Sequence, residues 1–256
     1  MDDREVLERL DHERRTLVRS GEVVDRLIDV TRVRAADGSH HSVLYSSLDA
    51  SSADAAIARE IEHHRRLGVS FEWKAYAHDT PPDLLERLRR AGFDIGEQET
   101  VMVYDLSCDA AWINDAGAGE VRRVGRLEEV DTYRQLAQAM FGKDYSFTAN
   151  ELAADIRAGS TQHVGYIAYD GEQPVSLGRL YTHPDSHFGG LFGGATLASH
   201  RGRGFYRAVV AARARDARSA GARYLSVDAL PTSRPILERL GFRAVTCTWP
   251  CEVAGV

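Results

Sequence analysis

The chain has 256 residues, of which 43% are hydrophobic and 27% are charged, and its formal net charge is −6 at pH 7. This length and composition predict a globular protein of one or two domains with a substantial core. The acidic balance argues against general electrostatic binding to nucleic acid, because such proteins usually carry an excess of Lys and Arg. No run of about 18 apolar residues is present, so no membrane-spanning helix is expected.

The N-terminal stretch MDDREVLERLDHERR is charged and lacks the apolar core of a signal peptide, so we expect a cytoplasmic location. The cysteines are Cys108, Cys247 and Cys251, and an odd number without a secretion signal argues against a disulfide framework. Cys247 and Cys251 have no second Cys or His pair at suitable spacing, so we expect no metal site.

The elements of the first half follow from hydrophobic periodicity and from helix stop signals. Residues 107–119, SCDAAWINDAGAG, are small, polar and glycine-containing, which is typical of a linker. The predicted elements before it are a helix at 3–19, short strands within 27–48, a helix from Ser51 or Ser52 to Leu67 that stops at Gly68, the strand VSFEWKAYA, the helix DLLERLRRA and the strand ETVMVYDL.

The second half alternates helices and strands in an order that predicts an α/β fold with a mixed sheet. Its predicted elements are a strand at 120–124, helices at 126–141 and 149–158, the strands HVGYIAYD, PVSLGRLYT and LFGGATLA, a helix at 205–220, the strand ARYLSVDA, a helix near 234–240 and the strand FRAVTCTW. We therefore expect two domains, residues 1–112 and residues 118–256.

Both halves contain a helix that ends at a glycine, a strand, and then Leu-Glu-Arg-Leu followed by Gly-Phe. This shared order predicts an internal duplication. Two ordinary helix–strand–helix units would have the same order by coincidence, and that alternative remains open.

Residues 200–207, HRGRGFYR, lie between a predicted strand and a predicted helix. Gly202 and Gly204 permit a tight turn, and the backbone N–H groups at a helix N-terminus bind phosphate well. Three cationic side chains could neutralise such a ligand: Arg201, Arg203 and Arg207. A solvated turn has the same composition, so the loop by itself has low specificity.

In its context the loop is more specific. A strand, Arg-Gly-Arg-Gly, a helix, a strand, a second helix and Leu-Gly-Phe, over residues 120–249, resemble the GNAT superfamily of acyl-CoA-dependent N-acetyltransferases. The family signature is Arg or Gln, two residues, Gly, one residue, then Gly or Ala. Arg201 and Gly204 match it, whereas Tyr206 replaces the last small residue. The resemblance implies a GNAT-like fold of two tandem units, with acetyl-CoA as cosubstrate.

The resemblance also implies which residues bind the coenzyme. The turn would hold its pyrophosphate through backbone amides, and the preceding strand would pair with its pantetheine arm. The implied residues are Gly194, Ala195, Thr196, Arg201, Gly202, Arg203, Gly204, Phe205, Tyr206, Arg207 and Ser233. The glycines at 189, 190, 193 and 194 fit a strand that a ligand approaches closely. Ser233 could equally cap the helix that Pro235 helps to start.

For catalysis, the resemblance places Asp228 where some family members have a Glu that acts as general base. Capping or solvation at a strand end is the alternative role for Asp228. The usual general acid of the family is a Tyr, and here that position is Leu237, which cannot donate a proton. Water, Tyr206 or Tyr145 would then have to protonate the thiolate, or the site is inactive.

The segment FGKDYSFTAN, residues 141–150, is the expected acceptor-binding segment, through Phe141, Tyr145 and Phe147. Plain packing of these aromatic rings is the alternative. His183, Asp185 and His187 lie on a predicted hairpin turn, where a solvated turn is expected rather than a metal site.

The first half resembles a degenerate GNAT unit. Its corresponding helix begins SSADAAIARE, with Asp54 in the first turn and no Arg-x-x-Gly, and a carboxylate there repels phosphate. We expect no coenzyme site in residues 1–110. The expected function is acetyl transfer to a primary amine of a small molecule or peptide, by a monomer or homodimer without nucleic-acid or membrane partners. An acyl-CoA-binding module without transfer activity is the alternative.

Overall fold

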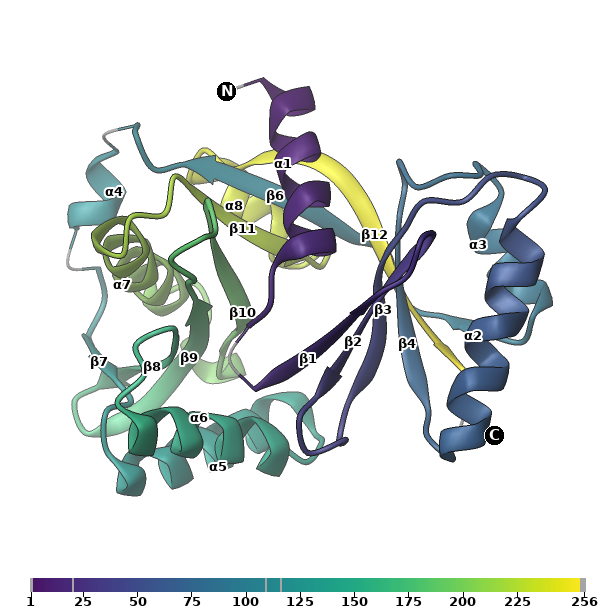
Figure 1. Ribbon diagram of the computed structural model, residues 1–256. Helices are drawn as coiled ribbons and strands as arrows, with labels where there is room; N and C mark the ends of the chain where they lie inside the picture. Colours follow the sequence, from purple (N-terminus) through teal and green to yellow (C-terminus); the bar gives the residue numbers. More distant parts are fainter. Residues whose placement is uncertain (1, 20, 109, 116, 254–256) are drawn as a thin grey trace. The chain divides into compact units, whose positions relative to one another are not determined.

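The computed structural model describes residues 2–19, 21–108, 110–115 and 117–253 (Figure 1). The chain divides into two compact units that do not follow chain order. Unit 1 comprises the described residues of Met1–Met102, Asp228–Arg239 and Arg243–Val256, and unit 2 comprises those of Val103–Val227 and Leu240–Phe242. The C-terminal segment therefore belongs to the same unit as the first hundred residues. The division into domains 1–112 and 118–256 stays a prediction.

Unit 1 contains a strand order of β1-β2-β3-β4-β12, with β5 paired to β12. The pairs β1–β2, β2–β3 and β4–β12 are antiparallel, and β3–β4 is parallel. The elements are α1 (Asp3–Thr16), β1 (Glu22–Arg26), β2 (Val30–Ala35), β3 (His41–Ser46), α2 (Ala53–Leu67), β4 (Phe71–Tyr76), α3 (Leu84–Arg90), β5 (Asp94–Ile95), the first residues of β6 (Glu99–Asp105), α8 (Arg234–Arg239) and β12 (Arg243–Val253).

The core of unit 1 forms where apolar side chains of β3, β4 and β12 meet those of α2 and α3. Trp73, Val43 and Leu88 are fully buried there, and Ile57 of α2 is 2% exposed. Strand β4 alternates buried and half-buried residues, which confirms the strand predicted from its alternating sequence. Helix α2 ends at Gly68, as the sequence predicted.

Unit 2 has the strand order β7-β8-β9-β10-β11, antiparallel except for the parallel pair β10–β11. Its elements are α4 (Ala111–Asn114), β7 (Glu120–Arg123), α5 (Leu127–Phe141), α6 (Ser146–Ala158), β8 (His163–Asp170), β9 (Gln173–Tyr181), β10 (Phe188–Thr196), the 3₁₀ turn η1 (Ala198–His200), α7 (Phe205–Ser219) and β11 (Tyr224–Ala229), whose last two residues belong to unit 1.

Helices cover both faces of the unit 2 strands (Figure 1). Leu177 of β9 packs in a core cluster with Tyr133 of α5 and Leu152 of α6. The next residue, Gly178, lies against Arg213 of α7. Because successive residues of a strand point to opposite faces, α5 and α6 cover one face of β9 and α7 covers the other. The mixed α/β fold is thus confirmed.

Two local features differ from the sequence-based expectation. The predicted linker contains the short helix α4, since Trp112 and Ile113 are buried, and Trp112 packs against Tyr104 and Phe242. Helix α6 begins at Ser146 rather than near 149, because the Asp144 carboxylate accepts a hydrogen bond from the Ser146 N–H and organises the first turn.

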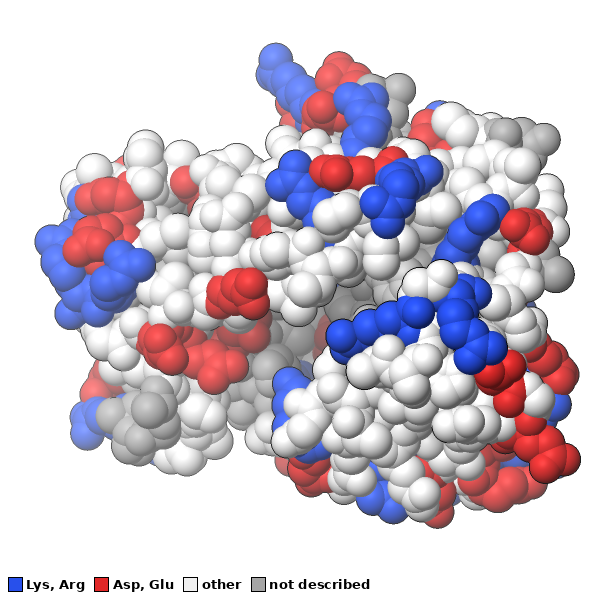
Figure 2. Space-filling view, turned by 180° about the vertical axis from the view of Figure 1, so that it is seen from behind, with Lys and Arg blue, Asp and Glu red and all other residues white. Residues whose placement is uncertain are grey.

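Charged side chains of both signs are interspersed on the face shown in Figure 2. On α1, for example, Arg4 pairs with Glu8 and Arg9 pairs with Glu5. Within the described residues, no helix combines the length and the apolar character that a membrane crossing needs.

Candidate coenzyme and acyl-transfer site

Strand β10 is paired along only part of its length on the β11 side. The ladder runs from Phe188 with Tyr224 to Gly190 with Ser226, whereas β10 itself continues to Thr196. On its other side β10 pairs with β9, and an irregularity interrupts that register between Phe192 and Ala195. Residues 191–196 therefore extend beyond the parallel ladder, which leaves an edge where an extended ligand can hydrogen-bond.

The turn after β10 presents the N-terminus of α7. Gly202 and Gly204 both have positive φ, at +75° and +91°. Within the described chain no side chain caps α7, and its first turn contains no acidic residue. A Cβ on Gly202 would meet nothing within 4 Å, and one on Gly204 would meet only Ala118, at 3.5 Å. The first amides of α7, which have no partner inside the helix, can accept an anion here.

The arginines of this turn already have partners in the chain. Arg203 forms an ion pair with Asp170, and Arg207 forms one with Asp115, each at 2.8 Å. The Nε of Arg201 donates to the carbonyl of Thr196 at 3.3 Å. Exposed ion pairs of this kind contribute roughly 0–1 kcal/mol, so a phosphate can compete for these side chains.

Three of the predicted coenzyme residues already make contacts within the protein. Phe205 is 2% exposed, so only its backbone N–H is available to a ligand. The carbonyl of Ala195 accepts a hydrogen bond from Ser176 at 2.7 Å, and the Ser176 hydroxyl also lies 2.8 Å from that of Thr196. A ligand along β10 would therefore use the remaining backbone groups of residues 194–196.

Gly189 and Gly190 leave room for neighbouring side chains of the protein, and the approach of a ligand to the strand there stays a prediction. A Cβ on Gly189 would lie 2.8 Å from the Cβ of Ala217 on α7. A Cβ on Gly190 would lie 2.6 Å from the ring of Phe192. Close packing of the sheet against α7 therefore accounts for Gly189, and the ring of Phe192 on the same strand accounts for Gly190.

The predicted base Asp228 belongs to unit 1 and is part of an ionic cluster. The Nζ of Lys74 lies 3.0 Å from Oδ2 of Asp228 and 2.9 Å from Oε2 of Glu99. Burial disfavours the charged form of Lys74, but the charges of Asp228, Tyr76 and Glu99 prevail and raise its pKa. Burial and the nearby Asp228 raise the pKa of Tyr76 to about 12. Asp228, whose side chain is 30% exposed, thus shares an ammonium with Glu99.

Ser233 and Leu237 also lie in unit 1, around α8. The Ser233 hydroxyl donates to the carbonyl of Leu230 at 3.2 Å, in the turn that precedes the helix. Leu237 is fully buried. At the position where the family usually has a tyrosine, this chain therefore has a packing residue without an ionisable proton.

The predicted acceptor segment connects α5 and α6. Phe141 and Phe147 are 36% and 43% exposed, and Tyr145 is half-buried. The rings of Phe141 and Tyr145 stack with their centroids 5.1 Å apart. An aromatic surface is thus presented at this end of the two helices.

The histidines of the β9–β10 hairpin form a local turn. The backbone N–H of Asp185 donates to Nδ1 of His183 at 3.1 Å. No group of three or more His, Cys, Asp or Glu side chains that could hold a metal ion occurs in the described ranges.

Sequence reasoning missed three polar side chains near the β10 irregularity, namely Tyr133, Arg179 and Arg213. Arg213 is 1% exposed and donates to the carbonyls of Val209, Arg179 and Phe192 at 3.2–3.4 Å. Burial lowers its pKa. The only available signal was its spacing, since Arg213 comes four residues after Val209 on the apolar face of α7.

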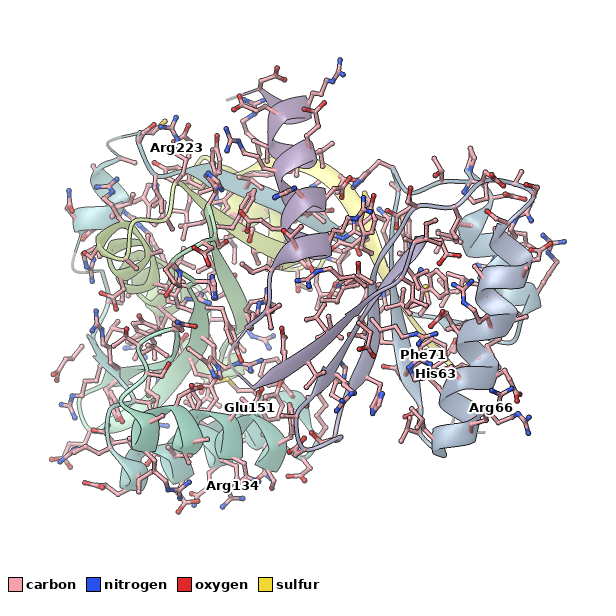
Figure 3. The ribbon with its side chains drawn as sticks, in the orientation of Figure 1. His63, Arg66, Phe71, Arg134, Glu151 and Arg223 are labelled. Carbon is pink, nitrogen blue, oxygen red and sulfur yellow. The ribbon has the colours of Figure 1, made fainter. Side chains whose placement is uncertain are left out.

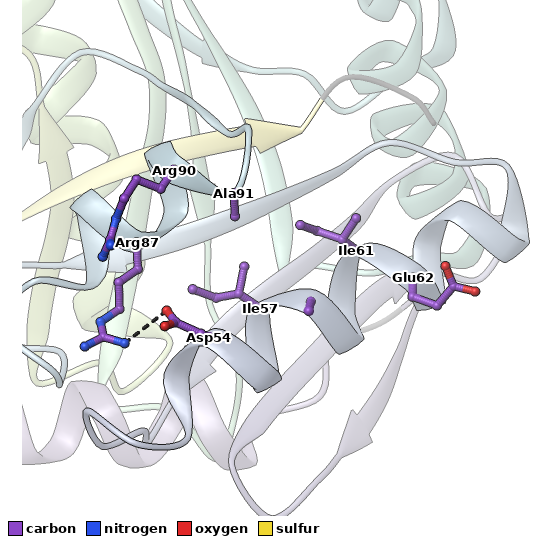
Figure 4. Close-up of a pocket in the computed structure, with 8 residues that line it drawn as sticks. Asp54, Ile57, Ile61, Glu62, Arg87, Arg90 and Ala91 are labelled. Carbon is purple, nitrogen blue, oxygen red and sulfur yellow. Dashed lines mark ion pairs between the residues drawn. The ribbon is translucent and has the colours of Figure 1, made fainter.

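Unit 1 has a groove of 470 Å³ between α2 and α3, lined by Ile57 and Ile61 among others (Figure 4). At one end, Asp54 in the first turn of α2 pairs with Arg87 at 3.0 Å. The N-terminus of α2 thus carries a carboxylate where that of α7 has none.

A second hollow of unit 1, of 360 Å³, is lined by His41, His63 and His64 among others. The ring of His64 stacks on Phe71 with centroids 3.9 Å apart, and Figure 3 shows His63 and Phe71 in this region. Burial lowers the pKa of all three histidines, which favours their neutral forms.

Solved structures share this fold over most of the chain. They include a GCN5-related N-acetyltransferase from Kribbella flavida, with 13% identity, a TM-score of 0.69, and coverage of 99% of this chain and 95% of that one. A GCN5-related N-acetyltransferase from Sphaerobacter thermophilus has 12% identity, a TM-score of 0.58 and coverage of 91% and 83%. A tandem GNAT protein from the clavulanic acid biosynthesis pathway has 14% identity, a TM-score of 0.57 and coverage of 93% and 84%.

The fold is therefore of the GNAT acetyltransferase class. Residues 130–242 match the model of the Acetyltransferase (GNAT) family, so this part of the chain is similar to that family. The match confirms the resemblance found in the sequence, and it includes the turn at 201–204 and helix α7. No curated protein matches the sequence.

Proposed function

We propose that the protein is an acetyl-CoA-dependent N-acetyltransferase that acts on a primary amine of a small molecule or peptide. The observation that carries this proposal is the end of β10, which extends beyond its ladder with β11, followed by a turn and the N-terminus of α7, which no side chain caps within the described residues. An extended thioester arm fits the first feature, and a diphosphate fits the second.

The coenzyme contacts follow from this arrangement. The backbone amides of residues 202–207 bind the pyrophosphate, with charge supplied by the arginines of the turn. The backbone of Gly194, Ala195 and Thr196 pairs with the pantetheine arm beyond the β11 ladder. Ser233 contributes a hydroxyl to the same coenzyme.

In the reaction, the neutral amine attacks the thioester carbonyl carbon, the C–S bond breaks, and coenzyme A leaves as its thiolate. Asp228 accepts the proton that the amine loses, through a water molecule, because its side chain is short. Lys74 keeps this carboxylate in place by its ion pair. Protonation of the thiolate by solvent suffices, since a thiol with a pKa of about 8.5 is a fair leaving group.

The first half serves as a GNAT-like unit without a coenzyme site. The Asp54 carboxylate in the first turn of α2 opposes phosphate binding there. In this proposal the chain is a tandem protein in which only the turn before α7 holds acetyl-CoA.

Calorimetric titration with acetyl-CoA tests the coenzyme site. Gly204→Val places a branched side chain on the turn and should weaken binding at least 10-fold. Gly159→Val is the matched control, because Gly159 also has positive φ and open space around it, at the end of α6. Equal dissociation constants for the wild type and Gly204→Val would contradict the phosphate assignment.

A thiol-release assay with acetyl-CoA and a panel of amines tests the transfer. Asp228→Asn should reduce kcat by roughly 10²-fold, as expected for loss of a general base, without weakening the binding of acetyl-CoA. The second candidate function, an acyl-CoA-binding module without activity, is favoured by the buried Leu237. Tight binding of acetyl-CoA with no turnover on any amine would support that alternative.

A further inference from the structure

Three polar groups converge on the irregular part of β10 from the α5 and α6 side. Gly193 has φ +55° and no side chain. A Cβ at this position would lie 3.7 Å from both Nε and Nη2 of Arg179, on β9, and 4.0 Å from the hydroxyl of Tyr133, on α5. The missing side chain thus leaves a small space that faces two N–H groups and one O–H group.

Two of these groups have no partner in the described part of the chain. Tyr133 is fully buried, and the Arg179 side chain lies near enough to its hydroxyl to lower its pKa, although the two groups do not reach ordinary hydrogen-bond geometry. The Nε of Arg179 is likewise buried and unpaired. Burial raises the pKa of Tyr133 to about 12, so the hydroxyl remains a donor at neutral pH. Buried donors without acceptors are unfavourable, which points to a ligand that supplies the acceptors.

The charge around this space is positive. Arg179 forms an ion pair through Nη1 with Glu151 on α6, at 3.9 Å, and Figure 3 shows Glu151 on the side of α6 towards the strands. Glu151 also has another contact in the chain. On the opposite face of β9, the buried Arg213 adds a second guanidinium. Its hydrogen bonds within the described residues go to backbone carbonyl groups, which do not neutralise its charge. An anion would balance this charge.

We propose that Arg179 and Tyr133 bind a carboxylate of the amine acceptor, so that the preferred acceptors are amines of the amino-acid type. A guanidinium binds both oxygens of a carboxylate in one plane, and the tyrosine hydroxyl donates a further hydrogen bond. Gly193 has no side chain that would cover these donors. This inference rests on the proposed function, since it identifies the anion as part of the acceptor.

The test uses pairs of product-like probes that differ only in charge. These are N-acetylglycine with N-acetylglycinamide, and N-acetyl-β-alanine with its amide, each titrated calorimetrically in the presence of coenzyme A. The variants are Arg179→Met and Tyr133→Phe. Arg134→Met is the control, because Arg134 is the next residue on α5, pairs with Asp131, and points away from the strands in Figure 3.

The wild type and Arg134→Met should prefer at least one carboxylate over its amide by 10-fold or more. Arg179→Met should abolish this preference, and Tyr133→Phe should reduce it about fivefold. In turnover assays the loss should appear in KM for carboxylated amines and leave kcat for uncharged amines unchanged. Binding of acetyl-CoA should be the same in all variants.

The carboxylate site would be overturned if the wild type binds acetyl-CoA but binds each carboxylate probe and its amide equally tightly. It would also be overturned if the wild type binds acetyl-CoA but none of these probes. Survival of the preference in Arg179→Met would do the same, as would an equal loss of kcat on charged and uncharged amines, which indicates a role in the transfer step. Absence of acetyl-CoA binding to the wild type would instead reject the proposed function, and with it the assignment of the anion to an acceptor.

Discussion

Tyr206 fills the space that a side chain at Gly194 would need. A Cβ on Gly194 would lie 3.0 Å from Cε2 of Tyr206 and 3.3 Å from Nη2 of Arg213. Tyr206 is the residue that departs from the GNAT signature, and its ring packs from α7 onto β10 at the glycine. A side chain at position 194 and the ring of Tyr206 would therefore compete for the same space.

Gly194→Ala should destabilise the fold by about 1–3 kcal/mol, because the added methyl group meets a ring that is held in place. Tyr206→Ala in the same chain should relieve the contact, so the double variant should be more stable than the sum of the two single effects predicts. Urea unfolding of the four proteins measures this coupling. Strictly additive free energies would show that the two side chains do not compete.

In the proposed coenzyme site, Asp170 would compete with the phosphate for Arg203. Its carboxylate pairs with Arg203 at 2.8 Å and lies 3.5 Å from Nε2 of His200. Asp170→Asn removes a negative charge near the turn and releases Arg203, so acetyl-CoA should bind two- to fivefold more tightly at low ionic strength. The gain should shrink in 0.5 M salt, since exposed charges are screened. Weaker binding by this variant would mean that Asp170 positions the turn for the coenzyme.

Lys74 separates two carboxylates that would otherwise repel each other. Lys74→Met leaves Asp228 and Glu99 without their shared ammonium and should lower the free energy of unfolding by about 1–3 kcal/mol at pH 7. Glu99→Gln in the Lys74→Met background should restore part of the stability. Failure of the Glu99→Gln change to restore any stability would indicate lost packing instead.

Because Tyr133 is buried, we expect the folded protein to lose stability at high pH. Burial raises its pKa in the folded protein from 10 to about 12. The stability that the neutral hydroxyl contributes is therefore fully present below pH 10 and is lost as the pH rises to about 12. A shift of two units corresponds to roughly 3 kcal/mol. Tyr133→Phe cannot ionise and should therefore gain stability relative to the wild type between pH 9 and 11.

At pH 7 the same variant should be no less stable than the wild type, because the Tyr133 hydroxyl makes no hydrogen bond with the described residues. Urea unfolding at pH 7 and pH 10.5 provides both comparisons. A destabilisation above about 1 kcal/mol at pH 7 would reveal a partner for the hydroxyl.

Most helices and strands could be predicted from the sequence, because their signals are local. Strand β8 has the predicted bounds, and α7 begins at the predicted Phe205. The family was recognised from the order of these elements around Arg201 and Gly204. The wrong prediction of a linker also has a local cause. The segment contains the helix α4, because two buried apolar residues interrupt its polar composition.

The order of elements, the glycine turn before α7 and the missing tyrosine at Leu237 follow from the sequence alone, because backbone preferences and periodicity act over a few residues. Only the tertiary structure decided that Lys74 meets Asp228, and that Arg179 and Tyr133 converge on Gly193. These partners come from elements far apart in the chain. Their meeting depends on strand register and on one bulge in β10, and neither is recorded in local patterns of hydrophobicity.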